Sequence, residues 1–133
     1  MTGLCMGWAG VIWAQLAVTD FTLAWQHTVE KVRWEEDYHV AAQGIQLLSA
    51  RVKGSGAGME IPPSARFGDG SWHYQPVMQP LQPLRLARTP QAGDYQICQG
   101  DGCQPLSDWL GPPDADQPAV ELWACPNAGQ LRN

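Results

Sequence analysis

The sequence is poor in charged residues, and the charge it carries is mainly acidic. Charged residues make up 16% of the 133 residues, the formal net charge is −5, and no Lys or Arg precedes Lys31. Nucleic-acid-binding proteins usually carry a basic stripe, because the phosphate backbone supplies much of their affinity. The sequence contains no basic run, so it argues against a nucleic-acid partner.

A long hydrophobic run is also missing. The apolar stretch Leu4–Val18 is too short for a comfortable membrane span, which needs about 20 residues. It also lacks the positively charged start of a secretory signal peptide. Two interpretations stay open, a signal or anchor sequence and a β-hairpin. We favour the hairpin, with strands at Leu4–Trp8 and Val11–Val18 around an Ala9-Gly10 turn, which makes these residues part of the core.

What the sequence does contain favours β-structure. Its 14 glycines and 11 prolines indicate many short elements joined by turns, and its 7 tryptophans suit strands. We therefore predict a single all-β domain of about eight to ten short antiparallel strands, either a sandwich or a partly closed barrel. The domain is expected over residues 1–126, with a flexible C-terminal tail at residues 127–133.

Alternation of apolar and polar residues locates the later strands. They are expected at Phe21–Gln26, Val32–Ala41, Ile45–Lys53, Ser71–Gln75, Leu84–Ala87, Gly93–Cys98, Cys103–Leu106 and Ala119–Cys125. Helix is an alternative for Val40–Leu48. Ser107–Leu110 is expected to form one helical turn capped by Ser107. We expect the N-terminal hairpin to share one sheet with the Phe21 strand and with the last strand.

Charged groups gather just after the Phe21 strand, and a glycine-rich loop, GSGAGME, follows at Gly54–Glu60. Alternate glycines can point successive backbone N–H groups at an anion. The candidate ligand-binding residues are His27, Glu30, Lys31, Glu36, Gly56 and Gly58. In this hypothesis the His27 and Lys31 side chains and the loop amides converge on a small carboxylate or another anion.

Plainer interpretations compete with this site. His27 continues the buried face of Phe21 and Leu23, where a histidine is more often a core residue hydrogen-bonded to a carboxylate such as Glu30 or Glu36. The glycines also suit a bulge or a tight corner. A divalent metal held by His27, Glu30 and Glu36 ranks last, since the ligand spacing does not repeat. We expect no metal and no cofactor.

Enzyme motifs are absent from the sequence. Ser55 lies in G-S-G and not in the G-x-S-x-G pattern of a nucleophile elbow. The consecutive acids Glu35, Glu36 and Asp37 alternate between two faces of a strand, so they do not form a catalytic carboxylate pair. We assign no catalytic residue and favour a binding or assembly module. The alternative is a small hydrolase or a metal-dependent enzyme centred on His27.

Four cysteines bear on the cellular compartment. Cys98 and Cys103 flank the expected hairpin loop, where a disulfide can form across the two strands. Cys5 and Cys125 lie in the first and last strands, and their bridge would join the chain ends. We favour these two disulfides over free thiols or a zinc site, because the CxxxxC spacing matches zinc knuckles poorly. Disulfides would indicate an oxidising compartment such as a periplasm.

Two motifs together resemble a known family. They are FTLAWQHTVEK at Phe21–Lys31, followed by EEDY at Glu35–Tyr38, and the loop at Gly54–Glu60. This combination is similar to the bacterial family catalogued as domain of unknown function 1850, which usually has Ser at the position of Thr28. The likeness extends over nearly the whole chain.

The resemblance implies an accessory role at the cell envelope and implies no activity. Family members are often encoded beside tripartite solute transporters, and many carry a signal or membrane anchor upstream. The expected partners are accordingly a membrane transporter component or a small anionic solute. The expected location is the periplasm or cell envelope, with the cytoplasm as the alternative.

Overall fold

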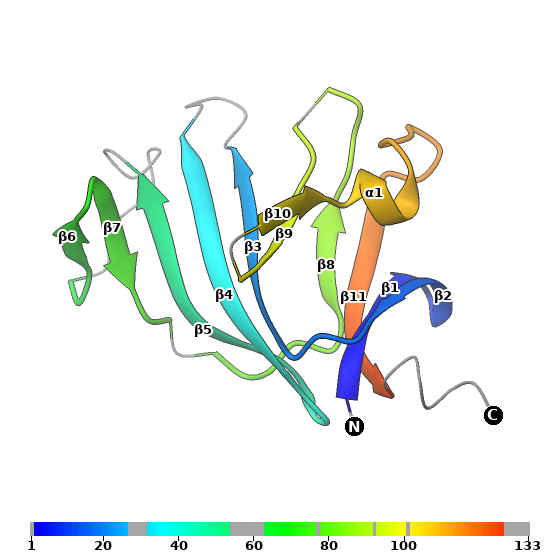
Figure 1. Ribbon diagram of the computed structural model, residues 1–133, viewed down its shortest axis with the longest axis horizontal. Coiled ribbons are helices and arrows are strands. Elements are labelled where there is room, and N and C mark those ends of the chain that lie inside the picture. The colour runs from blue at the N-terminus through cyan, green and yellow to red at the C-terminus, as the bar shows by residue number, and fades with distance from the viewer. Residues whose placement is uncertain are drawn as a thin grey trace.

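The computed structural model describes residues 2–26, 32–53, 63–76, 78–91, 93–100 and 102–126. Within them the chain forms eleven antiparallel strands in two sheets and one short helix (Figure 1). The predicted all-β class is confirmed, although the described strands exceed the expected number. No closed barrel forms among the described strands.

The small sheet has the order β2-β1-β11-β8 and the large sheet the order β10-β9-β3-β4-β5-β7-β6. The small sheet consists of β1 (Thr2–Trp8), β2 (Val11–Leu16), β8 (Leu84–Ala87) and β11 (Ala119–Pro126). The large sheet consists of β3 (Asp20–Gln26), β4 (Arg33–Ala41), β5 (Gly44–Lys53), β6 (Arg66–Gly68), β7 (Ser71–Tyr74), β9 (Gln96–Gln99) and β10 (Gly102–Pro105). The helix α1 (Ser107–Leu110) follows β10.

The N-terminal hairpin forms as predicted. Ala9 and Gly10 join β1 to β2 with φ angles of 51° and 84°, and positive φ at both central residues is what a tight hairpin turn of matching twist requires. Gly7 lies at a bulge in this pair, where an added Cβ would collide with the Val11 carbonyl oxygen. Glycine at this position therefore allows the two backbones to approach closely.

The expected sheet assignment of this hairpin was wrong in one respect. β1 pairs with the last strand β11, as expected, but β3 belongs to the other sheet. The chain crosses between the sheets after Leu16, and the Val40 N–H donates to the Thr19 carbonyl at 2.7 Å at the crossing. Alternating residues reveal which side of a strand is buried, but they do not reveal which sheet it joins.

The core lies between the two sheets, so each sheet has an inner face toward the other and an outer face away from it. Both sheets contribute fully buried aliphatic side chains. The buried core cluster consists of Leu4, Met6, Leu16, Val18, Phe21, Leu23, Tyr38, Val40, Ile45, Leu47, Leu86, Ile97, Leu106, Val120, Leu122 and Ala124. Burial of apolar surface on this scale is the main stabilising contribution to a domain of this size.

Two local expectations need correction. The alternative helix over residues 40–48 does not form, because these residues belong to β4, a turn and β5. Ser107 does not cap α1: Leu106 is the N-cap residue, and the Ser107 N–H donates to a carboxylate oxygen of Asp94 at 2.9 Å. A carboxylate distant in sequence thus satisfies a backbone donor of the first turn.

Both favoured disulfides are present. Cys5–Cys125 joins β1 to β11 with a Cα–Cα distance of 6.0 Å, and Cys98–Cys103 joins the cross-strand pair of the β9–β10 hairpin. The predicted tail at residues 127–133 lies outside the described residues. Within the described residues, no helix is long and apolar enough to cross a membrane.

Candidate functional site

Most of the predicted ligand-binding residues lie outside the described part of the chain. They are His27, Glu30, Lys31, Gly56 and Gly58, and their convergence on a ligand stays a prediction. The described strand ends beside them, Gln26, Arg33 and Lys53, belong to three adjacent strands of the large sheet. Only Glu36 of the predicted set has a described environment.

Glu36 lies on the inner face of the large sheet. It is opposite Leu23 on β3 and Ala50 on β5, both of which are buried. The Tyr38 hydroxyl donates to Glu36 Oε1 at 2.6 Å. Burial raises the pKa of the Glu36 carboxyl group, and this hydrogen bond only partly opposes the effect.

The Glu36 carboxylate affects several tyrosines. Burial and then the negative charge of Glu36 raise the pKa of Tyr38, and the same two causes raise the pKa of Tyr74 and Tyr95. Trp25 and Trp34 stack nearby on the same face, with ring centroids 5.9 Å apart. The inner face around Glu36 is therefore largely aromatic.

The outer face of the large sheet carries an ionic network instead. Asp37 accepts hydrogen bonds from the Thr22 and Ser49 hydroxyl groups, each at 2.6 Å. Both terminal nitrogens of the Arg51 guanidinium also donate to it, at 2.6 and 3.0 Å. These bonds, with that from Arg51 contributing most, hold the pKa of Asp37 well below its usual range.

The network continues along β4. Glu35 accepts from Arg51 Nε at 2.9 Å with one carboxylate oxygen and from Arg33 Nε at 2.7 Å with the other. The hydrogen bonds from Arg33 and Arg51 lower the pKa of Glu35, although burial opposes them and is the largest single influence. Arg33 also donates to the side-chain oxygen of Gln96 on β9 at 3.3 Å.

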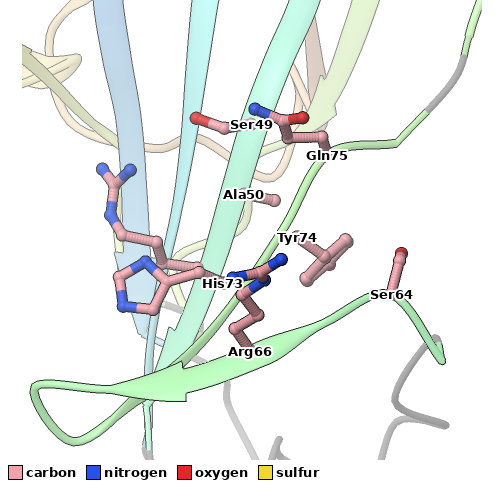
Figure 2. Close-up of a pocket in the computed structure, with 8 residues that line it drawn as sticks. Ser49, Ala50, Ser64, Arg66, His73, Tyr74 and Gln75 are labelled. Carbon is pink, nitrogen blue, oxygen red and sulfur yellow. The ribbon is translucent and has the colours of Figure 1, made fainter.

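A pocket opens where this network reaches the edge of the sheet (Figure 2). Its volume is about 530 Å³. The lining residues come from β5, from β6 and its preceding turn, and from β7 and the residue after it: Ser49, Ala50, Arg51, Ser64, Arg66, His73, Tyr74 and Gln75. Arg66 and His73 are directly opposite each other on β6 and β7, so their side chains share the outer face.

The pocket contains one cation without an ion pair. Arg51 is balanced by Glu35 and Asp37. Arg66 is exposed and forms no salt bridge with any residue that the structure describes. His73 Nε2 lies 3.0 Å from the Gly68 carbonyl oxygen. Because a carbonyl oxygen can only accept a hydrogen bond, Nε2 carries the proton, and Nδ1 takes no part in this bond.

Sequence reasoning missed this pocket. The strand Ser71–Gln75, which contains His73, was expected, but Arg66 lies in a three-residue strand that was not predicted. The pairing of β7 with β5 then places His73 opposite Arg51, which is 22 positions away in the sequence. No local pattern contains that information.

A family comparison agrees with the sequence motifs. The profile described as Domain of unknown function (DUF1850) matches residues 21–106. The chain belongs to this family. The DUF1850 match covers every strand of the large sheet apart from the first residue of β3, and it includes all the pocket-lining residues. No curated protein and no solved structure matches the chain significantly.

Metal ligands do not gather in the described region. Among residues 2–26, 32–53, 63–76, 78–91, 93–100 and 102–126, no group of three His, Cys, Asp or Glu side chains could hold a metal ion. The chemistry that the pocket offers is hydrogen bonding and positive charge. Guanidinium groups provide planar pairs of N–H donors that suit carboxylate and phosphate oxygens.

Proposed function

We propose that this DUF1850 domain is a non-catalytic binding module that holds a small anionic solute in the pocket at the β5–β7–β6 edge. One observation carries the proposal: two arginines and a histidine surround a pocket of about 530 Å³ on a protein of net charge −5. Ligand pockets commonly have volumes of about 300–1,000 Å³. The basic residues of this acidic protein are scarce, and Arg51, Arg66 and His73 are among the eight residues that line this pocket.

The polar groups of the pocket suit a carboxylate. Arg66 supplies a guanidinium with no ion pair to a described carboxylate, and Arg51 is held rigidly by Glu35 and Asp37. Ser64 adds a hydroxyl group at the pocket wall, whereas the Ser49 hydroxyl already donates to Asp37. Because Glu35 and Asp37 balance the charge of Arg51, we assign the direct contact with the anion to Arg66.

A place at the cell envelope, beside a tripartite solute transporter, is the finer part of the proposal. The resemblance of the sequence motifs suggests this association, and two disulfides are typical of proteins in oxidising compartments. A domain there that binds an anionic solute would act alongside the solute-binding or membrane component of the transporter. The alternative of a small hydrolase or metal-dependent enzyme centred on His27 stays a prediction.

Calorimetric titration tests the pocket. The probes are acetate, succinate and inorganic phosphate, with the neutral amide succinamide as a control for shape. We expect saturable binding of at least one anion and about a tenfold or larger loss of affinity in Arg66→Ala, because a charge-assisted hydrogen bond is removed.

Arg85→Ala is the control for overall charge, since it removes an equal charge from an arginine on the small sheet that is 69% exposed and ion-paired with Glu121. Unchanged affinity in this variant would show that Arg66 acts locally. Equal binding of succinamide and succinate would overturn the anion-binding function. Equal losses of affinity in Arg66→Ala and Arg85→Ala would show that the anion responds only to the overall charge of the protein. That result would contradict binding in the pocket.

A further inference from the structure

The two disulfides lie in opposite environments. Cys5 is fully buried and Cys125 is only 9% exposed. Cys98 is half-buried and Cys103 is exposed, on the outer face of the large sheet. Exposed disulfides are accessible to attacking thiols, whereas buried structural disulfides resist reduction under native conditions. Of the two disulfides, only Cys98–Cys103 in the β9–β10 hairpin is accessible to an attacking thiol.

A cation lies beside the exposed disulfide. The Arg33 guanidinium Nη2 is 3.9 Å from Cys98 Sγ and 3.9 Å from Cys103 Sγ. Glu35 and Gln96 hold the guanidinium in this position through hydrogen bonds of 2.7 and 3.3 Å. Glu35 is shared with Arg51, so its single negative charge is divided between two arginines.

A positive charge in this position favours the thiolate form of a cysteine. The thiolate is both the leaving group when a disulfide is cleaved and the nucleophile when it forms again. Arg33 therefore stabilises the domain's own thiolate, which leaves when the disulfide is cleaved and attacks when it forms again. The Cys5–Cys125 bridge has no arginine contact among the described residues; a Gln15 amide lies beside its sulfurs instead.

We propose that Cys98–Cys103 is a thiol–disulfide exchange site whose partner is a dithiol reductant, with Arg33 stabilising the thiolate that is released. A thiolate of the partner attacks the exposed Cys103 Sγ, a new S–S bond forms, and the Cys98–Cys103 bond breaks to release the Cys98 thiolate beside Arg33. The second thiol of the partner, once deprotonated, then attacks the mixed disulfide and releases Cys103. The partner becomes a disulfide, and two protons pass to the domain thiols.

The fold can tolerate this opening. The bridge closes a loop with a sequence separation of 5, so its loss frees little chain entropy. β9 is also held by its pairing with β3 and by its inward-facing Ile97, which lies in the core, and neither contact involves the bridge. The distant Cys5–Cys125 bridge, with a separation of 120, keeps the chain ends joined during the reaction.

Native-state reduction tests the site. The oxidised protein is treated with dithiothreitol, quenched with N-ethylmaleimide at timed intervals, and mapped by peptide mass spectrometry. We expect Cys98 and Cys103 to be labelled at least about a hundredfold faster than Cys5 and Cys125, because only the former are accessible. Equal rates for the two bridges, or faster labelling of the buried one, would overturn the proposal.

Arg33→Gln separates the charge effect from simple exposure. We expect this variant to exchange several-fold more slowly and, after reduction, to show a smaller thiolate absorbance at neutral pH. Lys53→Gln removes a nearby exposed charge and should leave both readouts unchanged. An Arg33→Gln rate and thiolate absorbance equal to those of wild type would contradict the role of Arg33.

Circular dichroism verifies that each variant is folded. Should Arg33→Gln lose its fold, Arg33→Lys and the salt dependence of the wild-type rate provide the same test. We expect Arg33→Lys to retain part of the rate, and high salt to slow the wild type, since mobile ions screen the charge. A wild-type rate independent of salt, with thiolate absorbance also independent of salt, would then contradict the proposal.

Discussion

Glu36 and Asp37 are consecutive carboxylic acids whose pKa values shift in opposite directions. Burial raises that of Glu36 on the inner face, and hydrogen bonds, chiefly from Arg51, lower that of Asp37 on the outer face. One residue along β4 therefore separates an aromatic, largely buried environment from an ionic, partly solvent-exposed one. The comparison shows that the two faces of the large sheet stabilise the fold by different means.

The inner face depends on apolar packing, and the outer face depends on charge-assisted hydrogen bonds. Leu23 on the inner face is 1% exposed, whereas the side chains of Asp37 and Arg51 on the outer face are 30% and 26% exposed. Ion pairs at such exposures contribute little unless they form a network with good geometry, which Asp37 does. Mutations on the two faces should therefore differ in size and in pH dependence.

The largest effect is expected from the inner face. Leu23→Ala should lower the free energy of unfolding by about 3 kcal/mol, because it removes buried methyl groups and leaves a cavity. Leu48→Ala is the matched control, since Leu48 is 48% exposed and should change stability by about 0.5 kcal/mol or less. Urea unfolding monitored by tryptophan fluorescence measures both. Similar losses in the two variants would contradict the packing of Leu23.

The next largest effect is expected on the outer face. Asp37→Asn should cost about 2 kcal/mol at neutral pH, because the amide cannot accept from Arg51, Thr22 and Ser49 together. Asp20→Asn, at a side chain that is 69% exposed, should leave the free energy of unfolding nearly unchanged. The same urea experiment applies. A neutral Asp37→Asn would show that the network makes no net contribution.

The stability difference between wild type and Asp37→Asn should depend on pH. The folded-state pKa of Asp37 is lowered from its ordinary value of 3.8, so its contribution is fully present above that value and declines as the pH falls below it. The stability gap between wild type and Asp37→Asn should therefore narrow below about pH 4. Denaturation curves at successive pH values measure the gap. A stability gap that widens as the pH falls would contradict the lowered pKa of Asp37.

The smallest effect, with the opposite sign, is expected from Glu36→Gln. The raised pKa means that charging Glu36 costs the folded state stability, a penalty present above the folded pKa and relieved as the pH falls toward 4.5. Glutamine keeps an acceptor for the Tyr38 hydroxyl. Thermal melting at neutral pH should show a slightly more stable variant, by about 1 kcal/mol or less, and the advantage should vanish in acid. A destabilised variant would indicate that the carboxylate itself is required.

Local sequence patterns predicted individual strands well. The alternation of Phe21, Leu23 and Trp25 indicates β3 directly, and the Ala9-Gly10 pair indicates the first hairpin turn. The Cys98–Cys103 bridge follows from the same local logic, since both cysteines flank one hairpin loop. These features depend on neighbours close in sequence.

Pairings between distant segments were predicted only in part. The association of β1 with β11 was expected, but the separate sheet in which β3 pairs with β4 and β9 was not, because alternation is compatible with several such pairings. The pocket depends on the same information, because Arg51 and His73 meet only when β5 and β7 pair. The predicted His27 site falls outside the described residues and was neither found nor contradicted.

The pairing of β1 with β11 has a practical consequence for experiments on this domain. Thr2 lies opposite Pro126, so both ends of the described fold lie at the same end of the small sheet. β6 and β7 lie away from them, at the far edge of the large sheet (Figure 1). A tether fused beyond either residue would attach this end of the molecule to a sensor surface or a bead. Immobilised in this way, the molecule would present its basic pocket outward to the flowing solution.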